Sequence, residues 1–145
     1  GISYISTLAN GPFNQVESMK SFNVGLNNTI RLYKSKNIPI HIISQPPHQK
    51  YLPESVYFSV YDRRFELEEL ALERADFDKL ESFSKSAFLA RAEDINYHYI
   101  ADLFCENDRC PIGTDEVSFY FDDNHLSIAG AEKLRGLFRK ILTTN

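Results

Sequence analysis

An aspartate and a histidine three residues apart, Asp122 and His125, are the side chains in this chain best suited to acid–base chemistry. A carboxylate in this position can accept a hydrogen bond from the imidazole Nδ1–H, which leaves Nε2 free as a base. Alternatively, Asp122 and Asp123 are ordinary turn residues and His125 packs against the next helix. A weaker, third interpretation is a metal site formed by Asp122, Asp123 and His125. Residues 122–125 alone do not decide between these interpretations.

The residues on either side of this pair predict a strand before it and a helix after it. Phe119 to Phe121 are three consecutive aromatic residues, which favours a short buried strand. Ser127 is well placed to cap the helix. Apolar residues then recur at helical spacing, at Leu134, Leu137, Phe138, Ile141 and Leu142. The pair would therefore lie on a loop at the end of a strand, where catalytic groups are common.

The first half of the chain predicts one unit of an α/β sheet. Residues 17–36 carry apolar side chains at helical spacing, and residues 38–43 form an apolar strand. Residues 95–100 are a second strand candidate because they are rich in β-forming residues. His41 and His98 lie inside these strands and are interpreted as structural. The predicted fold class is α/β, with a short parallel sheet flanked by helices.

A proline-stiffened loop, residues 44–48, follows the first strand. If the strands are parallel, this loop lies at the same edge of the sheet as Asp122 and His125. Gln45 and His48 are therefore candidate substrate contacts. The alternative is that both are polar residues of an ordinary surface loop.

Two segments lie between the predicted strands. Residues 51–61 are aromatic and irregular, which is typical of a loop packed by its own aromatic side chains; a lid or a carbohydrate-stacking surface is the alternative. Residues 66–91 predict two helices with a break near residues 75–76. Asp76 or Asp78 would cap the second of them.

The composition is that of one ordinary globular domain, residues 1–145, with 43% hydrophobic and 25% charged residues. A net charge of −4 without any basic run argues against a nucleic-acid partner. No apolar run is long enough to span a bilayer. The chain begins with Gly1 instead of Met and looks like an excised segment, so a missing targeting sequence is uninformative.

The two cysteines, Cys105 and Cys110, have four residues between them. They could form a disulfide, worth roughly 2 kcal/mol by the loop-entropy relation, or remain two free thiols. A zinc site is less favoured because no second Cys or His pair is spaced to complete it.

The segment Tyr-Phe-Asp-Asp-Asn-His-Leu-Ser-Ile-Ala-Gly-Ala, residues 120–131, resembles the last sequence block of the SGNH (GDSL-like) hydrolases. Its second half is most similar to SGNH domains fused to family 3 membrane acyltransferases, which modify surface polysaccharides. The resemblance implies a three-layer α/β/α, flavodoxin-like fold, with Asp122 as the triad acid and His125 as the base. A cysteine pair just upstream of this block recurs in those domains. The resemblance therefore favours a Cys105–Cys110 disulfide and a location outside the cytoplasm.

The family carries its nucleophile in a Gly-Asp-Ser motif, and none of the thirteen serines here lies in one. The resemblance covers residues 102–142 most securely and extends more loosely from Phe22. We therefore expect the nucleophile, with its strand and helix, to precede residue 1 and the isolated chain to be inactive. An exposed sheet edge would then allow a homodimer.

The resemblance thus implies the Asp-His-bearing part of an SGNH-type O-acyltransferase or esterase that acts on acyl groups of surface polysaccharide. Its partners would be an acyl donor, a polysaccharide acceptor and a membrane acyltransferase domain in the same protein. Its location would be the periplasmic or extracellular face, tethered to the inner membrane. No cofactor and no metal are expected. The alternative is a non-catalytic extracytoplasmic binding module that uses residues 51–61 as its contact surface.

Overall fold

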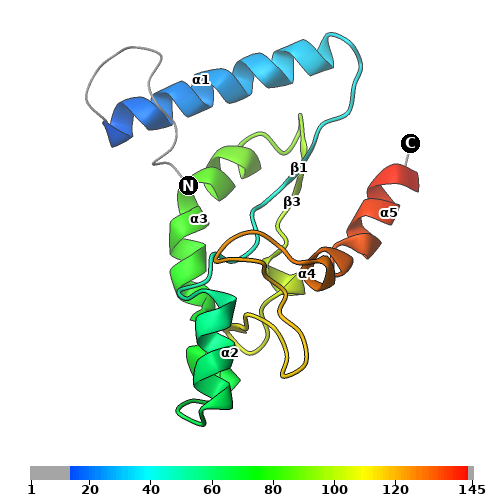
Figure 1. Ribbon diagram of the computed structural model, residues 1–145. Coiled ribbons are helices and arrows are strands. Elements are labelled where there is room, and N and C mark those ends of the chain that lie inside the picture. Colours follow the sequence, from blue (N-terminus) through cyan, green and yellow to red (C-terminus); the bar gives the residue numbers. More distant parts are fainter. Residues whose placement is uncertain (1–13, 144–145) are drawn as a thin grey trace. The chain divides into compact units, whose positions relative to one another are not determined.

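The computed structural model describes residues 14–143 of the α/β chain shown in Figure 1. β1 and β3 form a short parallel sheet of two strands, and β2 pairs with β4 in an antiparallel one. The α/β class with a short parallel sheet is therefore confirmed. The elements are α1 (Gln15–Lys34), β1 (His41–Ile43), α2 (Pro53–Tyr61), a 3-10 helix (Leu67–Leu70), β2 (Leu72–Glu73), α3 (Arg74–Leu89), β3 (Asn96–His98), a second 3-10 helix (Ala101–Leu103), β4 (Arg109–Cys110), α4 (Ile128–Glu132) and α5 (Arg135–Thr143).

The described residues divide into two compact units. One contains the residues up to Ile42 together with Leu80–His98, and the other contains Ile43–Lys79 and the residues from Tyr99 onward. The boundary falls within α3, which contributes its first turns to the second unit. That residues 1–145 form a single domain stays a prediction.

In the first unit, α1 packs on the second half of α3 through aromatic rings. The cap residue before the helix is Asn14, whose side chain accepts hydrogen bonds from the backbone N–H groups of the first turn. Phe22 makes edge-to-face contacts with Phe83 and Phe88, at 5.5 and 5.8 Å between ring centroids. The helix predicted for residues 17–36 is confirmed, although it begins and ends two residues earlier than predicted.

The two strands of the parallel sheet each contribute a histidine to one contact. His41 Nδ1 lies 2.9 Å from His98 Nε2, and the two rings are stacked with their centroids 5.2 Å apart. One nitrogen must donate and the other accept, so each imidazole satisfies the other. Both strands are three residues long, about half the lengths predicted from the sequence.

The second unit has its main core directly beneath the Asp-x-x-His segment. Tyr120 and Phe104 are each 2% exposed, with ring centroids 6.1 Å apart. Around them the core is closed by Val56, Ile100, Ile112 and Leu134. Because Tyr120 is buried two residues before Asp122, this core fixes the start of the turn that carries the carboxylate.

Residues 51–61 are not an irregular loop, and that prediction is wrong. They include helix α2, which starts at Pro53. A proline suits the first helical position because its missing N–H would have no partner there. Val56 is buried, whereas Phe58 and Tyr61 are 64% and 87% exposed. The aromatic residues therefore lie mostly on the outer face of a helix.

The break predicted near residues 75–76 falls earlier in the chain. Leu72 and Glu73 form β2, which pairs with Cys110 and Arg109 of β4. This pairing ends the 3-10 helix, and α3 begins at once, at Arg74. Asp76 therefore lies in the first turn of α3, where a negative charge is favourable, and does not cap the helix.

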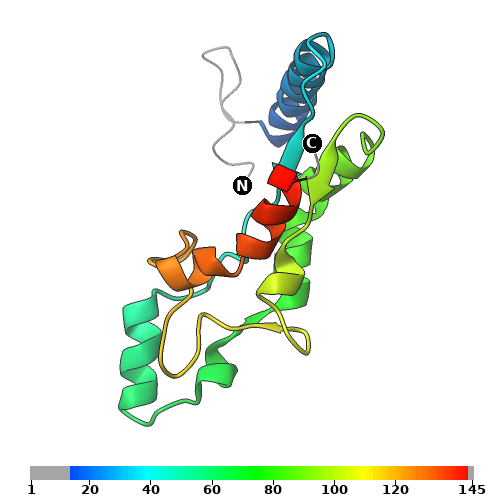
Figure 2. The same ribbon diagram turned by 90° about the vertical axis from the view of Figure 1, so that its right-hand side faces the viewer.

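The C-terminal region differs from the prediction in two ways. Phe119–Phe121 is not a buried strand: only isolated bridges form there, and Phe121 is 79% exposed. The expected single helix is divided into α4 and α5, because the α4 ladder ends at Lys133. Figure 2 shows the two helices in succession, coloured orange and red.

Cys105 and Cys110 form a disulfide, with a sulfur–sulfur distance of 2.02 Å. It closes the loop between the second 3-10 helix and β4. Both half-cystines are buried in a small cluster with Leu72, Phe77 and Ala101. The disulfide expected from the family resemblance is thus present in the structure.

Replacing both cysteines by serine is expected to lower the free energy of unfolding by about 2 kcal/mol, because the short loop then gains freedom in the unfolded chain. Urea unfolding of the oxidised wild type and the double variant measures the difference. Reduced wild-type chain is the matched control and should unfold near the variant. Equal midpoints for all three samples would show that the disulfide adds no stability.

Candidate active site

The Asp-x-x-His segment is a tight reversal of the backbone closed by its own hydrogen bonds. The Phe121 N–H donates to the carbonyl of His125 at 2.7 Å, and the Ser127 N–H donates to the carbonyl of Phe119 at 3.0 Å. The Ser127 hydroxyl oxygen then accepts from the Gly130 N–H at 3.2 Å, which caps α4 as predicted. The turn is therefore held between a buried core residue and the start of a helix.

Within this turn, Asp122 uses its two carboxylate oxygens differently. Oδ2 lies 2.7 Å from His125 Nδ1. Oδ1 accepts the backbone N–H groups of Asn124 and His125, at 2.9 and 2.7 Å. A carboxylate needs a donor, so Nδ1 carries the proton in this contact and Nε2 is the free nitrogen. The His125 side chain is 77% exposed, which leaves Nε2 open to a reacting group.

The surroundings of Asp122 favour its charged form. The backbone N–H of Asn124, followed by the backbone N–H and the imidazole of His125, lowers the pKa of Asp122 from 3.8 to about 2. The carboxylate is therefore ionised throughout the neutral range. An ionised carboxylate at Nδ1 can stabilise the imidazolium that forms when Nε2 takes up a proton.

We expect carbon-detected NMR to give an Asp122 carboxyl midpoint near pH 2 in the wild type. Since the pKa in the fold is depressed, the stability that these bonds contribute is present above pH 4 and is lost as the pH falls toward 2. His125→Ala should raise the midpoint only part of the way, because both backbone N–H donors remain. A wild-type midpoint at the ordinary value of 3.8 would contradict the bonding pattern.

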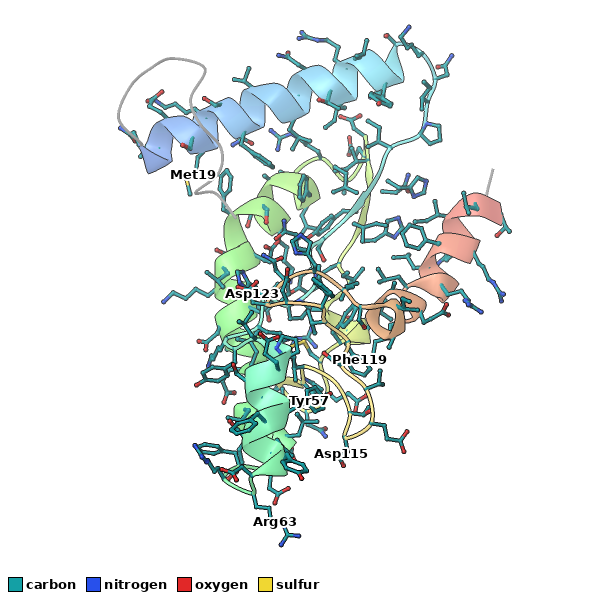
Figure 3. All side chains as sticks on the ribbon, in the orientation of Figure 1. Met19, Tyr57, Arg63, Asp115, Phe119 and Asp123 are labelled. Carbon is teal, nitrogen blue, oxygen red and sulfur yellow. A yellow bond between two sulfur atoms is a disulfide. The ribbon has the colours of Figure 1, made fainter. Side chains whose placement is uncertain are left out.

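The neighbouring aspartate, Asp123, belongs to a second carboxylate–imidazole pair. His48 Nε2 lies 3.0 Å from Asp123 Oδ2, and the Gln49 N–H donates to the Asp123 carbonyl at 2.7 Å. Figure 3 labels Asp123 near the segment that leads into α2. The structure thus brings His48 beside the Asp-x-x-His turn. Gln45 is exposed on the same loop, and among residues 14–143 no side-chain hydrogen bond joins it to the turn.

Gln49 is a site residue that the sequence did not predict. It is only 4% exposed, and its Nε2 donates to the carbonyl of Pro47 at 3.3 Å. Burial raises the pKa of the Tyr120 hydroxyl, and contact with the Gln49 side chain acts in the opposite direction. A glutamine in a polar loop normally faces water. The burial of Gln49 becomes apparent only in the folded structure, where its N–H contacts Asp123 of the 120–127 turn.

The third interpretation, a metal site at the two aspartates and His125, finds no support. In the described part of the chain, no three His, Cys, Asp or Glu side chains are grouped to hold a metal ion. Asp122 and Asp123 instead each contact a different histidine.

An aspartate-oriented histidine on a turn of an α/β fold is compatible with hydrolases and acyltransferases that use histidine as a base. A family model described as "SGNH domain (fused to AT3 domains)" matches residues 3–140, and the chain belongs to this family. It is therefore an SGNH-type acyl-modifying domain. The fusion named in the family description supports a membrane acyltransferase domain as its partner. Neither the curated proteins nor the solved structures contain a significant match. No helix among the described residues has the length and apolar character needed to cross a membrane.

Proposed function

We propose that Asp122 and His125 are the acid and base of an SGNH-type O-acyltransferase or esterase site. The observation that carries the proposal is the 2.7 Å contact between Nδ1 and Oδ2, which directs a free Nε2 toward solvent. In this mechanism Nε2 takes the proton of a serine hydroxyl as its oxygen attacks an acyl carbonyl, and Asp122 stabilises the imidazolium. The proton then passes to the departing alkoxide. In a second step a sugar hydroxyl or water accepts the acyl group.

The proposed substrate is an acyl group carried to or from a surface polysaccharide, outside the cytoplasm. The family description, with its fused acyltransferase domains, supports the acyl chemistry. The Cys105–Cys110 disulfide supports the compartment, because such bonds persist in oxidising surroundings. We further propose that the domain works while tethered to the membrane through an acyltransferase domain of the full-length protein.

A fluorophosphonate probe tests this proposal, since it labels only an activated serine. Intact mass should show one adduct on the full-length protein and none on the 145-residue chain, which has no Gly-Asp-Ser motif. The adduct should be absent from the His125→Ala full-length variant. An adduct on the 145-residue chain would place the nucleophile among its thirteen serines. A full-length protein that is never labelled would contradict the enzymatic function.

A second candidate function, a non-catalytic polysaccharide-binding module, is favoured by the aromatic residues around α2. A cleft of about 410 Å³ beside this helix combines aromatic, hydroxyl and carboxylate side chains. These groups can stack on a sugar ring and hydrogen-bond to its hydroxyls. The lining residues include Tyr51, Ser55, Ser59, Phe65 and Glu69.

Calorimetry with deacylated surface polysaccharide from the source organism distinguishes the two functions. The binding module would be favoured by two results together. The full-length protein shows no acyl-transfer activity, and polysaccharide binding is lost in Tyr51→Ala but kept in His125→Ala. If the protein is an enzyme that uses this cleft, Tyr51→Ala should raise KM for the polysaccharide and leave kcat nearly unchanged. Unchanged binding and an unchanged KM would exclude the cleft from either function.

A further inference from the structure

We propose that His48 and Gln49 are positioning residues that hold the catalytic turn in shape, instead of contacting the substrate. This inference rests on the proposed roles of Asp122 and His125. It starts from one peptide group, the bond between Asp123 and Asn124. The carbonyl oxygen of this group accepts the Gln49 N–H at 2.7 Å, and its N–H donates to Asp122 Oδ1 at 2.9 Å.

Because a peptide group is planar, fixing its carbonyl also fixes the direction of its N–H. The Gln49 backbone therefore aims the Asn124 N–H at the catalytic carboxylate. This N–H is also the largest of the influences that keep Asp122 ionised. Consecutive hydrogen bonds through one peptide polarise each other, which strengthens the second bond. A rotation of this single peptide would remove one of the two backbone bonds to Asp122 Oδ1 and so loosen the carboxylate that orients His125.

The side chain of Asp123 is held by the same loop. His48 occupies Asp123 Oδ2 at 3.0 Å. Two adjacent aspartates could otherwise compete for the one imidazole of His125. Since Asp123 already has an imidazole partner, Asp122 is left as the carboxylate that contacts His125 Nδ1.

The loop that provides these contacts is itself anchored in the core. Gln49 is 4% exposed, and Pro47 is fully buried. The Ser44 hydroxyl oxygen accepts the backbone N–H of Ile100, a core residue, at 3.0 Å. His48 and Gln49 therefore link the catalytic turn to a rigid part of the second unit, as residues that support a catalytic group must.

NMR of the ¹⁵N-labelled 145-residue chain tests this inference without requiring activity. The observed signals are the two ring ¹⁵N resonances of His125, detected through its carbon-bound ring protons, which report the tautomer that the bond to Asp122 selects. In His48→Ala we expect these signals to broaden or shift and the Asp122 titration midpoint to rise above the wild-type value. His48→Gln should restore the signals and the midpoint, because a glutamine amide can still donate to Asp123. Lys50→Ala is the matched control, since Lys50 pairs with Asp76 instead, and should leave the signals unchanged.

Asp123→Ala removes the same contact from the opposite side at a half-exposed position and should reproduce the effect of His48→Ala. In the full-length protein, His48→Ala should lower kcat by about 10-fold with KM unchanged, as a small misplacement of a catalytic group does. Unchanged His125 signals in both variants, or a raised KM at constant kcat, would overturn the positioning role and favour the substrate contact predicted from the sequence. Wild-type ring ¹⁵N shifts that do not show a protonated Nδ1 would instead overturn the Asp122–His125 pair itself.

Discussion

Replacing His125 by alanine should lower acyl transfer by the full-length protein by about 10⁶-fold, the loss typical when the histidine of such a triad is removed. The serine hydroxyl would then have no base. Asp122 cannot replace the imidazole, because its Oδ1 is occupied by the backbone N–H groups of Asn124 and His125. Asp122→Asn should cost less, about 10⁴-fold. An asparagine can present an N–H to Nδ1 and so favour the wrong imidazole tautomer. Hydrolysis of p-nitrophenyl acetate provides the measurement.

The matched control for these variants is Arg139→Ala, an exposed change on α5 in the same unit. It should keep wild-type activity, and all the variants should unfold at similar urea concentrations. Retention of more than about a tenth of the wild-type rate by His125→Ala would be far more than a triad histidine allows. Another group would then have to be the base. The proposed mechanism would then be wrong, even though the turn itself is intact.

The second large effect is expected at Gly130, in the first turn of α4. A methyl group added there would lie 2.0 Å from the carbonyl oxygen of Phe119 and 3.0 Å from Leu126 Cδ2. The obstacle is backbone, which cannot rotate away, so α4 must move. Gly130→Ala should therefore destabilise the chain by about 1–3 kcal/mol, the usual cost of overpacking.

Gly130→Ala should also disturb the Asp-x-x-His turn, because the same Phe119 carbonyl accepts the Ser127 N–H at 3.0 Å. We expect a lower urea midpoint together with shifted His125 ring ¹⁵N signals. The control is Gly136→Ala in α5, where an added Cβ meets nothing within 4 Å. Alanine is the better helix former, so that variant should be as stable as the wild type or slightly more stable. Equal stability of the two variants would refute the packing argument.

The parts of the fold that follow from neighbouring residues could be predicted from the sequence. The periodic apolar face of α1, the serine cap of α4 and the contact between Asp122 and His125 all depend on residues at most four apart. The parts that depend on distant partners could not. Residues 72–73 pair with the distant strand β4, and the buried Gln49 donates its N–H to Asp123 in the distant 120–127 turn.

Aromatic residues caused the other errors. Three in a row at 119–121 are typical of a buried strand, but here Tyr120 enters the core while Phe121 faces solvent. Residues 53–61 mix aromatic, β-branched and serine residues, whose helix propensity is modest, so the pattern hides α2. Pro53 at the first helical position was the one local signal for that helix.

The bonds that orient His125 join residues no more than three apart in the sequence. Contacts this local close a very small loop and lose little chain entropy when they form. The imidazole therefore does not wait for substrate to acquire its orientation, so substrate binding energy need not be spent on ordering it. In the proposed mechanism the remaining requirement is a serine hydroxyl delivered to Nε2. On this proposal, changes in the residues around the nucleophile would alter the acyl specificity while leaving His125 in working geometry.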